Sequence, residues 1–238
     1  MTETTTKGSS LGVAVIGGLI GAVLTAAVLV FATPQFLSRS IVRQGMLADP
    51  QILVEASDAL RDRQTAPLIA SSRSALETPF ASSWKGAEKP EVVLVEFYDY
   101  ACPYCKASNP HVDRLLKEKP GLRVVYRELP ILGQDSVEAA RLSLAASKAG
   151  RFRQFHDALY AAGRPAPDTN AAAARVANIA PTPAQDPAIE AELKRNFEIA
   201  SRLGATGTPL FVVGDRVLNG AVGYDALKQA IEAASKKS

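Results

Sequence analysis

Cysteine and histidine are scarce in this chain of 238 residues, which has two of each. A structural zinc site takes four ligands, often two Cys pairs or one pair with spaced histidines. Because His111 and His156 lie far apart, the scarcity argues against zinc. The two cysteines, Cys102 and Cys105, would close too short a loop for a strongly stabilising disulfide. Two uses remain for this pair: reversible thiol-disulfide exchange and binding of a soft ion such as Cu(I).

Dense positive charge is also missing. The net charge is only +3, and no Lys/Arg run stands beside a group of aromatic residues. The electrostatic footprint of a nucleic-acid binder is therefore absent, and we expect no nucleic-acid partner. With 47% hydrophobic and 21% charged residues, the chain has an ordinary globular composition and can bury a core.

One long segment has no charged residue at all. After a short polar N-terminus, residues 1–10, the chain runs from Leu11 to Ala32 without a charge. Such a run can span a bilayer, which needs about 20 apolar residues. The alternative is a cleaved signal peptide, with small residues near Ala32, although its apolar core would exceed the roughly 7 to 15 residues that are typical. We expect residues 11–32 to form a transmembrane anchor or a signal peptide.

The chemistry of the dithiol, and not the distribution of charge, predicts on which side of the membrane the main part of the chain lies. Arg39 and Arg43 follow the uncharged run and only Lys7 precedes it, so the positive-inside rule does not place the rest of the chain outside. An isolated dithiol is best suited to a compartment where disulfides persist. We therefore expect a single-pass protein of the inner membrane whose main part faces the periplasm.

Residues 35–66 are predicted to form a helical stalk, with a new helix starting at Asp49-Pro50. Leu53, Ala56 and Leu60 form a narrow apolar stripe, which must pack on the parent domain or on copies of itself. Residues 67–90 are rich in Ser, Ala and Pro and are interpreted as a linker followed by an edge element, and Trp84 is expected to be a core residue.

The apolar run from Val92 to Tyr98 predicts a strand that is buried on both faces of a sheet. Glu96 interrupts it. Burial disfavours an ionised carboxyl, so Glu96 is a candidate proton acceptor beneath the cysteines; the alternative is a side chain that reaches solvent at the sheet edge. The elements expected next are a helix from Pro103 to Glu118, a strand from Leu122 to Leu129, four helices between Asp135 and Leu203, strands at Leu210–Val213 and Arg216–Leu218, and a helix from Tyr224 to Ala234.

This order, with the cysteine pair at the start of the first helix, resembles the thioredoxin fold, and the helices between its halves resemble the insertion of DsbA-like disulfide oxidoreductases. The motifs that carry the resemblance are Val95–Tyr100 before Cys102-Pro103-Tyr104-Cys105, Glu128–Gly133, and Gly207-Thr208-Pro209. It implies an α/β thioredoxin domain at 91–133 and 204–236, with a helical insertion at 134–203. The stretch Leu47–Ser57 is similar to the N-terminal region of the ScsC-like (suppressor of copper sensitivity) branch, some members of which self-associate.

The resemblance also implies roles for individual residues. Cys102 would be the nucleophile and Cys105 the resolving thiol, with Pro103 and Tyr104 as the intervening dipeptide. Thr208-Pro209 would form a cis-proline loop that binds substrate as a strand does.

Glu96 would correspond to the family's buried acid, taking and returning the proton of Cys105. The implied activity is formation or isomerisation of disulfides in exported proteins, with the Cys102–Cys105 disulfide as the redox group and no other cofactor or metal. A membrane redox partner would reset the dithiol, and the stalk would allow a homo-oligomer. The alternative is a copper(I)-binding, copper-tolerance protein that uses the same thiolates.

Overall fold

The computed structural model describes residues 33–181 and 185–236. The predicted membrane span at 11–32 lies outside these residues, and within them no helix is long and apolar enough to cross a membrane. The chain divides into two compact units, residues 1–59 and residues 60–238.

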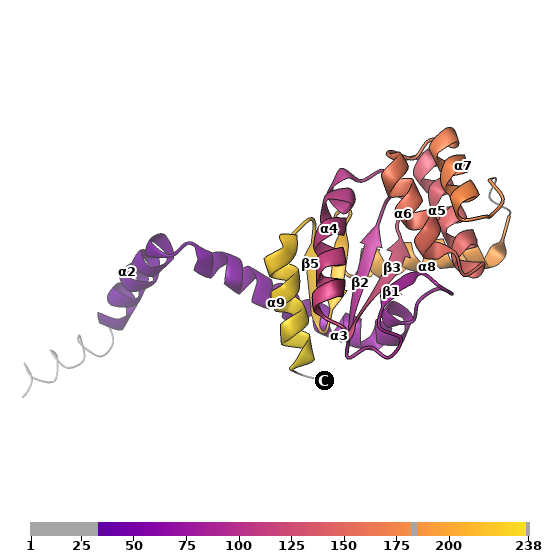
Figure 1. The fold of residues 1–238 in the computed structure, drawn as a ribbon. Helices are drawn as coiled ribbons and strands as arrows, with labels where there is room; N and C mark the ends of the chain where they lie inside the picture. The colour runs from indigo at the N-terminus through magenta and orange to yellow at the C-terminus, as the bar shows by residue number, and fades with distance from the viewer. Residues whose placement is uncertain (1–32, 182–184, 237–238) are drawn as a thin grey trace, which may run out of the picture. The chain divides into compact units, whose positions relative to one another are not determined.

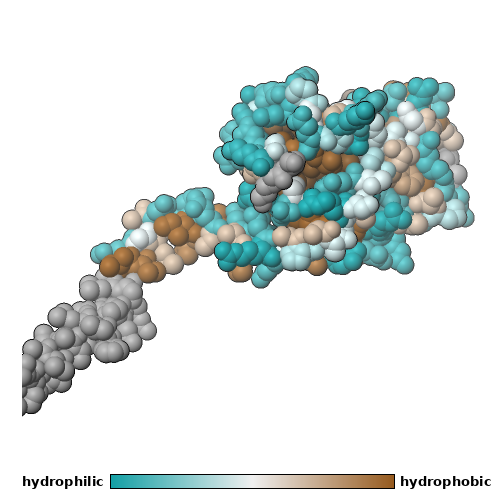
Figure 2. All heavy atoms as spheres, turned by 90° about the horizontal axis from the view of Figure 1, so that it is seen from below, coloured by the Kyte–Doolittle hydropathy of each residue, from teal (hydrophilic) through white to brown (hydrophobic). Residues whose placement is uncertain are grey.

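The described part of the first unit contains helix α2 (Thr33–Ala48) and the beginning of helix α3 (Gln51–Glu77). The carboxylate of Asp49 accepts a hydrogen bond from the backbone of Gln51 at 3.1 Å, as the predicted helix start at Asp49-Pro50 requires. Large apolar side chains on these helices are exposed: Ile41, Val42, Leu47, Leu53 and Val54. Figure 2 shows brown, hydrophobic surface on this part of the chain.

The prediction of a linker from residue 67 is wrong for residues 67–77, because α3 continues through Pro67 to Glu77. The physical reason is burial: Ile69 and Leu76 are each only 1% exposed, and they pack into a core cluster beneath the sheet. Their burial outweighs the backbone hydrogen bond that Pro67 removes. The expected edge element is strand β1 (Trp84–Gly86).

Five strands form one sheet in the order β1-β3-β2-β4-β5. Strand β2 (Val92–Tyr98) lies at its centre, parallel to β3 (Leu122–Glu128) and antiparallel to β4 (Leu210–Val213). Strand β5 (Arg216–Asn219) pairs with β4, and β1 pairs with β3. The central place of β2 explains its nearly continuous apolar sequence, since helices cover both of its faces.

Helices α4 (Pro103–Glu118) and α9 (Gly223–Ser235) lie side by side on one face of the sheet, while α3 and α8 pack on the other (Figure 1). The connection from β3 to β4 consists of four helices: α5 (Gln134–Lys148), α6 (Phe152–Ala162), α7 (Pro167–Val176) and α8 (Pro187–Arg202). Side chains alternate along β2, so Glu96 and Tyr98 point to the α4 face and Phe97 points to the other. The expected order of βαβ, helices and ββα is therefore present.

Candidate active site

The two cysteines lie where β2 ends and α4 begins. Cys102 is the residue that caps α4, and Pro103 takes the first helical position, where its missing N–H costs no hydrogen bond. Both thiols are free and buried, with Cys102 4% and Cys105 0% exposed. Tyr104, in contrast, is 64% exposed, so the dipeptide between the cysteines faces solvent.

Asp99 holds the turn that carries the cysteines, a role that the sequence interpretation missed. One carboxylate oxygen accepts from the backbone N–H of Ala101 at 2.8 Å. The other accepts from the N–H groups of Ile131 and Leu132 at 2.8 and 2.9 Å. Asp99 thus ties the loop before Cys102 to the loop after β3. The available signal was an aspartate directly after a buried strand, a common place for side-chain to backbone bonds.

The loop before β4 faces the first cysteine. The Thr208–Pro209 peptide bond is cis, and the Sγ of Cys102 donates to the carbonyl oxygen of Thr208 at 3.2 Å. Residues far apart in the sequence therefore meet at one thiol. The structure places Thr208 and Pro209 beside Cys102.

Glu96 lies beneath the dithiol on the central strand. Its side chain is 1% exposed, and neither carboxylate oxygen has a hydrogen-bond partner among the described residues. Burial raises the pKa of Glu96 to about 8; Lys85 opposes this increase, and Asp113 adds to it. The alternative that Glu96 reaches solvent at a sheet edge is wrong, because β2 is the middle strand.

The charge of Glu96 affects the pKa of the Cys105 thiol. Burial is the first cause that raises its pKa well above the ordinary value, and the charge of Glu96 is the second. The thiol therefore keeps its proton in the reduced protein. To become a nucleophile, Cys105 needs an acceptor for that proton, and Glu96 is the acid that acts on it most strongly.

A second buried acid, Glu128, lies on the same face at the end of β3, and sequence reasoning gave it no role. The hydroxyl of Tyr98 donates to the Glu128 carboxylate and also lies 3.1 Å from the hydroxyl of Tyr100. Tyr100 in turn contacts Ser143 at 2.9 Å and Nδ1 of His156 at 3.2 Å. Burial raises the pKa of Glu128 to about 8 and lowers that of His156, so burial disfavours the charged form of both groups in this network, which joins the sheet to the insertion.

An apolar groove leads to the cis-proline loop. Two adjoining pockets of about 270 and 170 Å³ share three lining residues, Leu129, Ile131 and Phe197. The second pocket extends to Gly207, directly before the loop that contacts Cys102. Phe197 is 58% exposed although it is large and apolar, which is typical of a surface that binds another chain.

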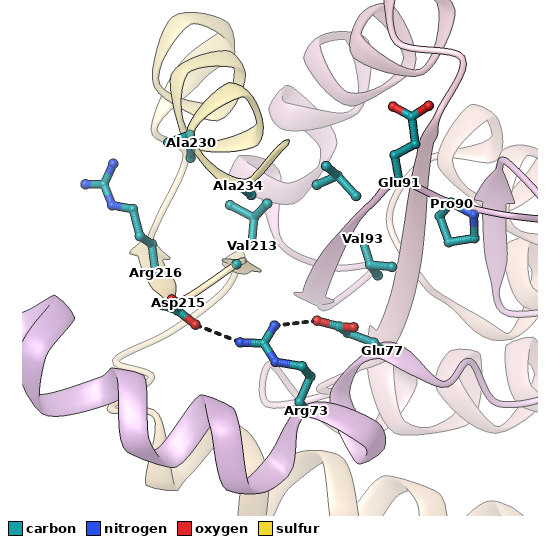
Figure 3. Close-up of a pocket in the computed structure, with 13 residues that line it drawn as sticks. Arg73, Glu77, Pro90, Glu91, Val93, Val213, Asp215, Arg216, Ala230 and Ala234 are labelled. Atoms are coloured by element: carbon teal, nitrogen blue, oxygen red, sulfur yellow. Dashed lines mark hydrogen bonds and ion pairs between the residues drawn. The ribbon is translucent and has the colours of Figure 1, made fainter. Parts of the chain in front are cut away.

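A further pocket of about 460 Å³ lies at the opposite end of β2 from the cysteines (Figure 3). Its most prominent side chain, Arg73, forms ion pairs with Glu77 and Asp215 at 2.8 and 2.7 Å. Arg216 on its rim pairs with Asp62 at 2.9 Å. Since the positive groups are held by carboxylates of the chain itself, we assign no anion site here.

Comparison with known proteins assigns the chain to a family. Residues 93–232, more than half of the chain, match the DSBA-like thioredoxin domain. A Proteus mirabilis ScsC variant is similar in structure, with a TM-score of 0.68, 29% identity, and coverage of 87% of this chain and 97% of that one. A periplasmic thioredoxin-like protein from Salmonella enterica serovar Typhimurium has a TM-score of 0.64 and 30% identity over 69% of this chain and 95% of its own.

A similarity of a different kind concerns transport proteins. The Na(+)/H(+) antiporter NhaA 1 of Salinispora arenicola is 31% identical over 174 residues, which are 63% of this chain and 24% of the antiporter. The chain therefore spans about a quarter of the length of that relative. The similarity locates a related segment within a much longer protein.

Proposed function

The chain belongs to the DsbA-like family of thiol-disulfide oxidoreductases, in its ScsC-like branch, and we propose that Cys102 and Cys105 exchange a disulfide with exported proteins. The observation that carries the proposal is the buried carboxyl of Glu96, which has no hydrogen-bond partner in the part of the chain that the structure describes, together with a free dithiol that the cis-proline loop faces. If the pair is kept oxidised, it forms disulfides in these proteins; if it is kept reduced, it isomerises them.

When the protein acts as an oxidant, the reaction begins with the Cys102–Cys105 disulfide. A substrate thiolate attacks Sγ of Cys102, a mixed disulfide forms, and the Cys102–Cys105 bond breaks. Cys105 leaves as a thiolate and takes a proton from Glu96. A second substrate thiolate then displaces Cys102, so the substrate leaves with the new disulfide. Isomerisation begins when the thiolate of Cys102 attacks a substrate disulfide, and it ends when another substrate thiolate displaces Cys102 and a different substrate disulfide forms. If Cys105 displaces the substrate sulfur instead, Glu96 receives the proton of Cys105, the Cys102–Cys105 disulfide forms and the substrate leaves reduced.

The groove supports a substrate that is extended and partly apolar. Its lining by Leu129, Ile131 and Phe197 offers apolar contact, and its end at Gly207 brings a bound segment to the loop that faces Cys102. Backbone groups of the loop can pair with an extended segment as a strand does. Unfolded exported proteins present such segments.

We place the catalytic domain in the periplasm, tethered by residues 11–32, and expect a membrane redox partner to reset the dithiol. The periplasmic Salmonella relative supports the compartment. The exposed apolar side chains of α2 and early α3 support self-association through the stalk. Light scattering of the part that follows residue 34, with and without residues 35–66, tests this: a smaller assembly after deletion supports the stalk as an oligomerisation segment, and an unchanged mass contradicts it.

The direction of electron flow is tested by the state of Cys102 in cells. A reduced dithiol in an oligomer indicates an isomerase, and an oxidised dithiol in a monomer indicates an oxidase.

The activity itself is tested with reduced and scrambled disulfide substrates. Wild-type protein should accelerate oxidation or reshuffling, and Cys102→Ser should not. Among the described residues, no group of three or more Cys, His, Asp and Glu side chains is placed to hold a metal ion. Stoichiometric Cu(I) binding in a protein that exchanges no disulfide would contradict the proposal and favour the copper-binding alternative.

A further inference from the structure

Tyr160 brings a hydroxyl from the helical insertion to the buried face of the sheet. It lies on α6, and its ring centroid is 5.0 Å from that of Tyr100 and 4.9 Å from that of His156. The residue is 7% exposed, and its hydroxyl is buried without a hydrogen-bond partner among the described residues. A buried hydroxyl without a partner is uncommon, because it loses its bonds to water and gains none.

The same face of the sheet holds a second unpartnered group, the carboxyl of Glu96. Glu96 and Tyr98 are two residues apart on β2 and therefore point the same way, and Tyr160 lies against Tyr98 with ring centroids 6.4 Å apart. After burial, the charges of Cys105 and Glu96 are the main causes that raise the pKa of Tyr160. The buried hydroxyl and the buried carboxyl thus belong to the same face of the sheet, on which Tyr98 lies between Glu96 along β2 and the ring of Tyr160.

Charged and titratable groups face Glu96 from each neighbouring element, and none of those in the described residues forms a direct hydrogen bond with it. They are Lys85 from β1, Cys105 and Asp113 from α4, Tyr126 from β3 and Tyr160 from α6. Lys85 is already paired with Asp157 at 2.6 Å and lies 3.8 Å from Asp113. On β4 the residue opposite Glu96 is Phe211, which has no polar group. The hydroxyls of Tyr126 and Tyr160 are the neutral donors on this face, and that of Tyr160 is fully buried with no partner among the described residues.

We propose that Tyr160 is a positioning residue, whose hydroxyl donates a hydrogen bond to a water molecule that in turn donates to the ionised carboxylate of Glu96. This inference rests on the proposed function of the dithiol. In the resolution step the Cys105 thiol gives its proton to Glu96, its sulfur bonds to Cys102, and the substrate sulfur leaves as a thiolate. A donor on Glu96 favours the ionised acid, which is the form that can accept that proton. The insertion then contributes to the chemistry as well as covering the site.

The test is the pH profile for resolution of a Cys102 mixed disulfide with glutathione, measured by rapid mixing in the full chain. Tyr160→Phe keeps the ring and removes the hydroxyl. We expect the inflection that reports Glu96 to move to higher pH by about one unit, with about a tenfold slower resolution near pH 7. An unchanged inflection would overturn the proposal.

Two controls separate this effect from a general loss of packing. Tyr98→Phe removes a buried hydroxyl from the same cluster, but that hydroxyl is engaged with Glu128 and Tyr100, so the inflection should stay in place. In a Glu96→Gln background, Tyr160→Phe should change the profile no further, because the interaction it removes is already gone. A shift that persists in that background contradicts the proposal.

A second measurement keeps this inference distinct from the proposed function. The pKa of Glu96 can be followed by carbon-13 NMR of its carboxyl group, assigned with Glu96→Gln, and needs no turnover. A wild-type protein that exchanges no disulfide would contradict the proposed function. The titration would still decide the role of Tyr160: a higher Glu96 pKa in Tyr160→Phe supports it, and an equal pKa overturns it.

Discussion

The two faces of the sheet bury charge in opposite ways. On the face towards α3 and α8, Arg127 is 2% exposed and its guanidinium lies 2.5 Å from the carboxylate of Glu192. It also donates to backbone carbonyls at the end of α3, including that of Thr78 at 2.6 Å. On the face towards α4, Glu96 is equally buried but has no partner among the described residues.

The difference shows which buried charge serves structure and which serves chemistry. Burial lowers the pKa of Arg127, and the interaction with Glu192 opposes that change, so the guanidinium keeps its partner and holds three elements together. No comparable partner offsets the burial of Glu96, and its pKa rises into the range where it can exchange a proton near neutral pH. A satisfied ion pair holds the fold, whereas an unsatisfied acid is available for reaction.

The largest expected effect is the loss of disulfide exchange in Cys102→Ser, which should leave the fold intact. Cys102→Ser should reduce disulfide exchange to background, because no sulfur remains for the mixed disulfide. The free energy of unfolding should fall by no more than about 1 kcal/mol, since a serine hydroxyl can also donate to the carbonyl of Thr208. An exchange assay combined with denaturant unfolding checks both. Residual exchange that depends on the variant protein would contradict the role of Cys102.

Substitutions on the opposite face of the sheet should reduce stability and leave disulfide exchange intact. Arg127→Met leaves the buried carboxylate of Glu192 with only the exposed Arg195, at 3.4 Å, as a partner, so the free energy of unfolding should fall by about 3 kcal/mol. Arg127→Met combined with Glu192→Met should recover most of that loss. Exchange per folded molecule should change little in the double variant. A large loss of exchange in folded protein would show that the two faces are not separate in function.

Glu96→Gln should change how stability depends on pH. The pKa of Glu96 is about 8 in the folded protein, above the ordinary value of 4.5, so folding holds a proton that the unfolded chain releases. Stability is therefore greatest below the lower value and falls as pH rises towards 8, by up to about 1.4 kcal/mol per pH unit. Denaturant unfolding between pH 5 and 9 should show a smaller decline in the variant. An identical decline would mean that Glu96 does not titrate in this range.

Local chemistry made much of the fold predictable. The apolar run of β2, the helix start at Pro103 and the order of the later elements all follow from periodicity and from capping residues. The error at residues 67–77 has a clear cause. Ser, Ala and Pro suggested a linker, but the burial of Ile69 and Leu76 is a tertiary effect that no local pattern records.

The site was predictable to the extent that it lies within one motif. Cys102, Cys105 and Glu96 are near each other in the sequence, and β-strand alternation relates the acid to the helix face. The contributions of Asp99, Glu128 and Tyr160 depend on contacts between segments that are far apart. Tyr160 meets the sheet only because the insertion folds back onto it, which periodicity cannot show.

The smallest expected effect concerns the dipeptide. Tyr104 is 64% exposed, so its influence on the thiols is weakened by solvent. Tyr104→His adds a group that can carry positive charge near a thiolate, and should raise the reduction potential by a few tens of millivolts. Equilibration with glutathione measures this. A lower potential in the variant would contradict the expected sign.

The reduction potential of the wild-type dithiol tests the central claim most directly, since it shows whether the two buried thiols form one exchanging redox pair. Glutathione buffers of graded potential, with acid quenching and mass analysis, would measure it. We predict a single two-electron transition between the values for thioredoxin and DsbA, about −270 and −120 mV. Thiols that do not exchange, or a potential at or below that of thioredoxin, would contradict the account.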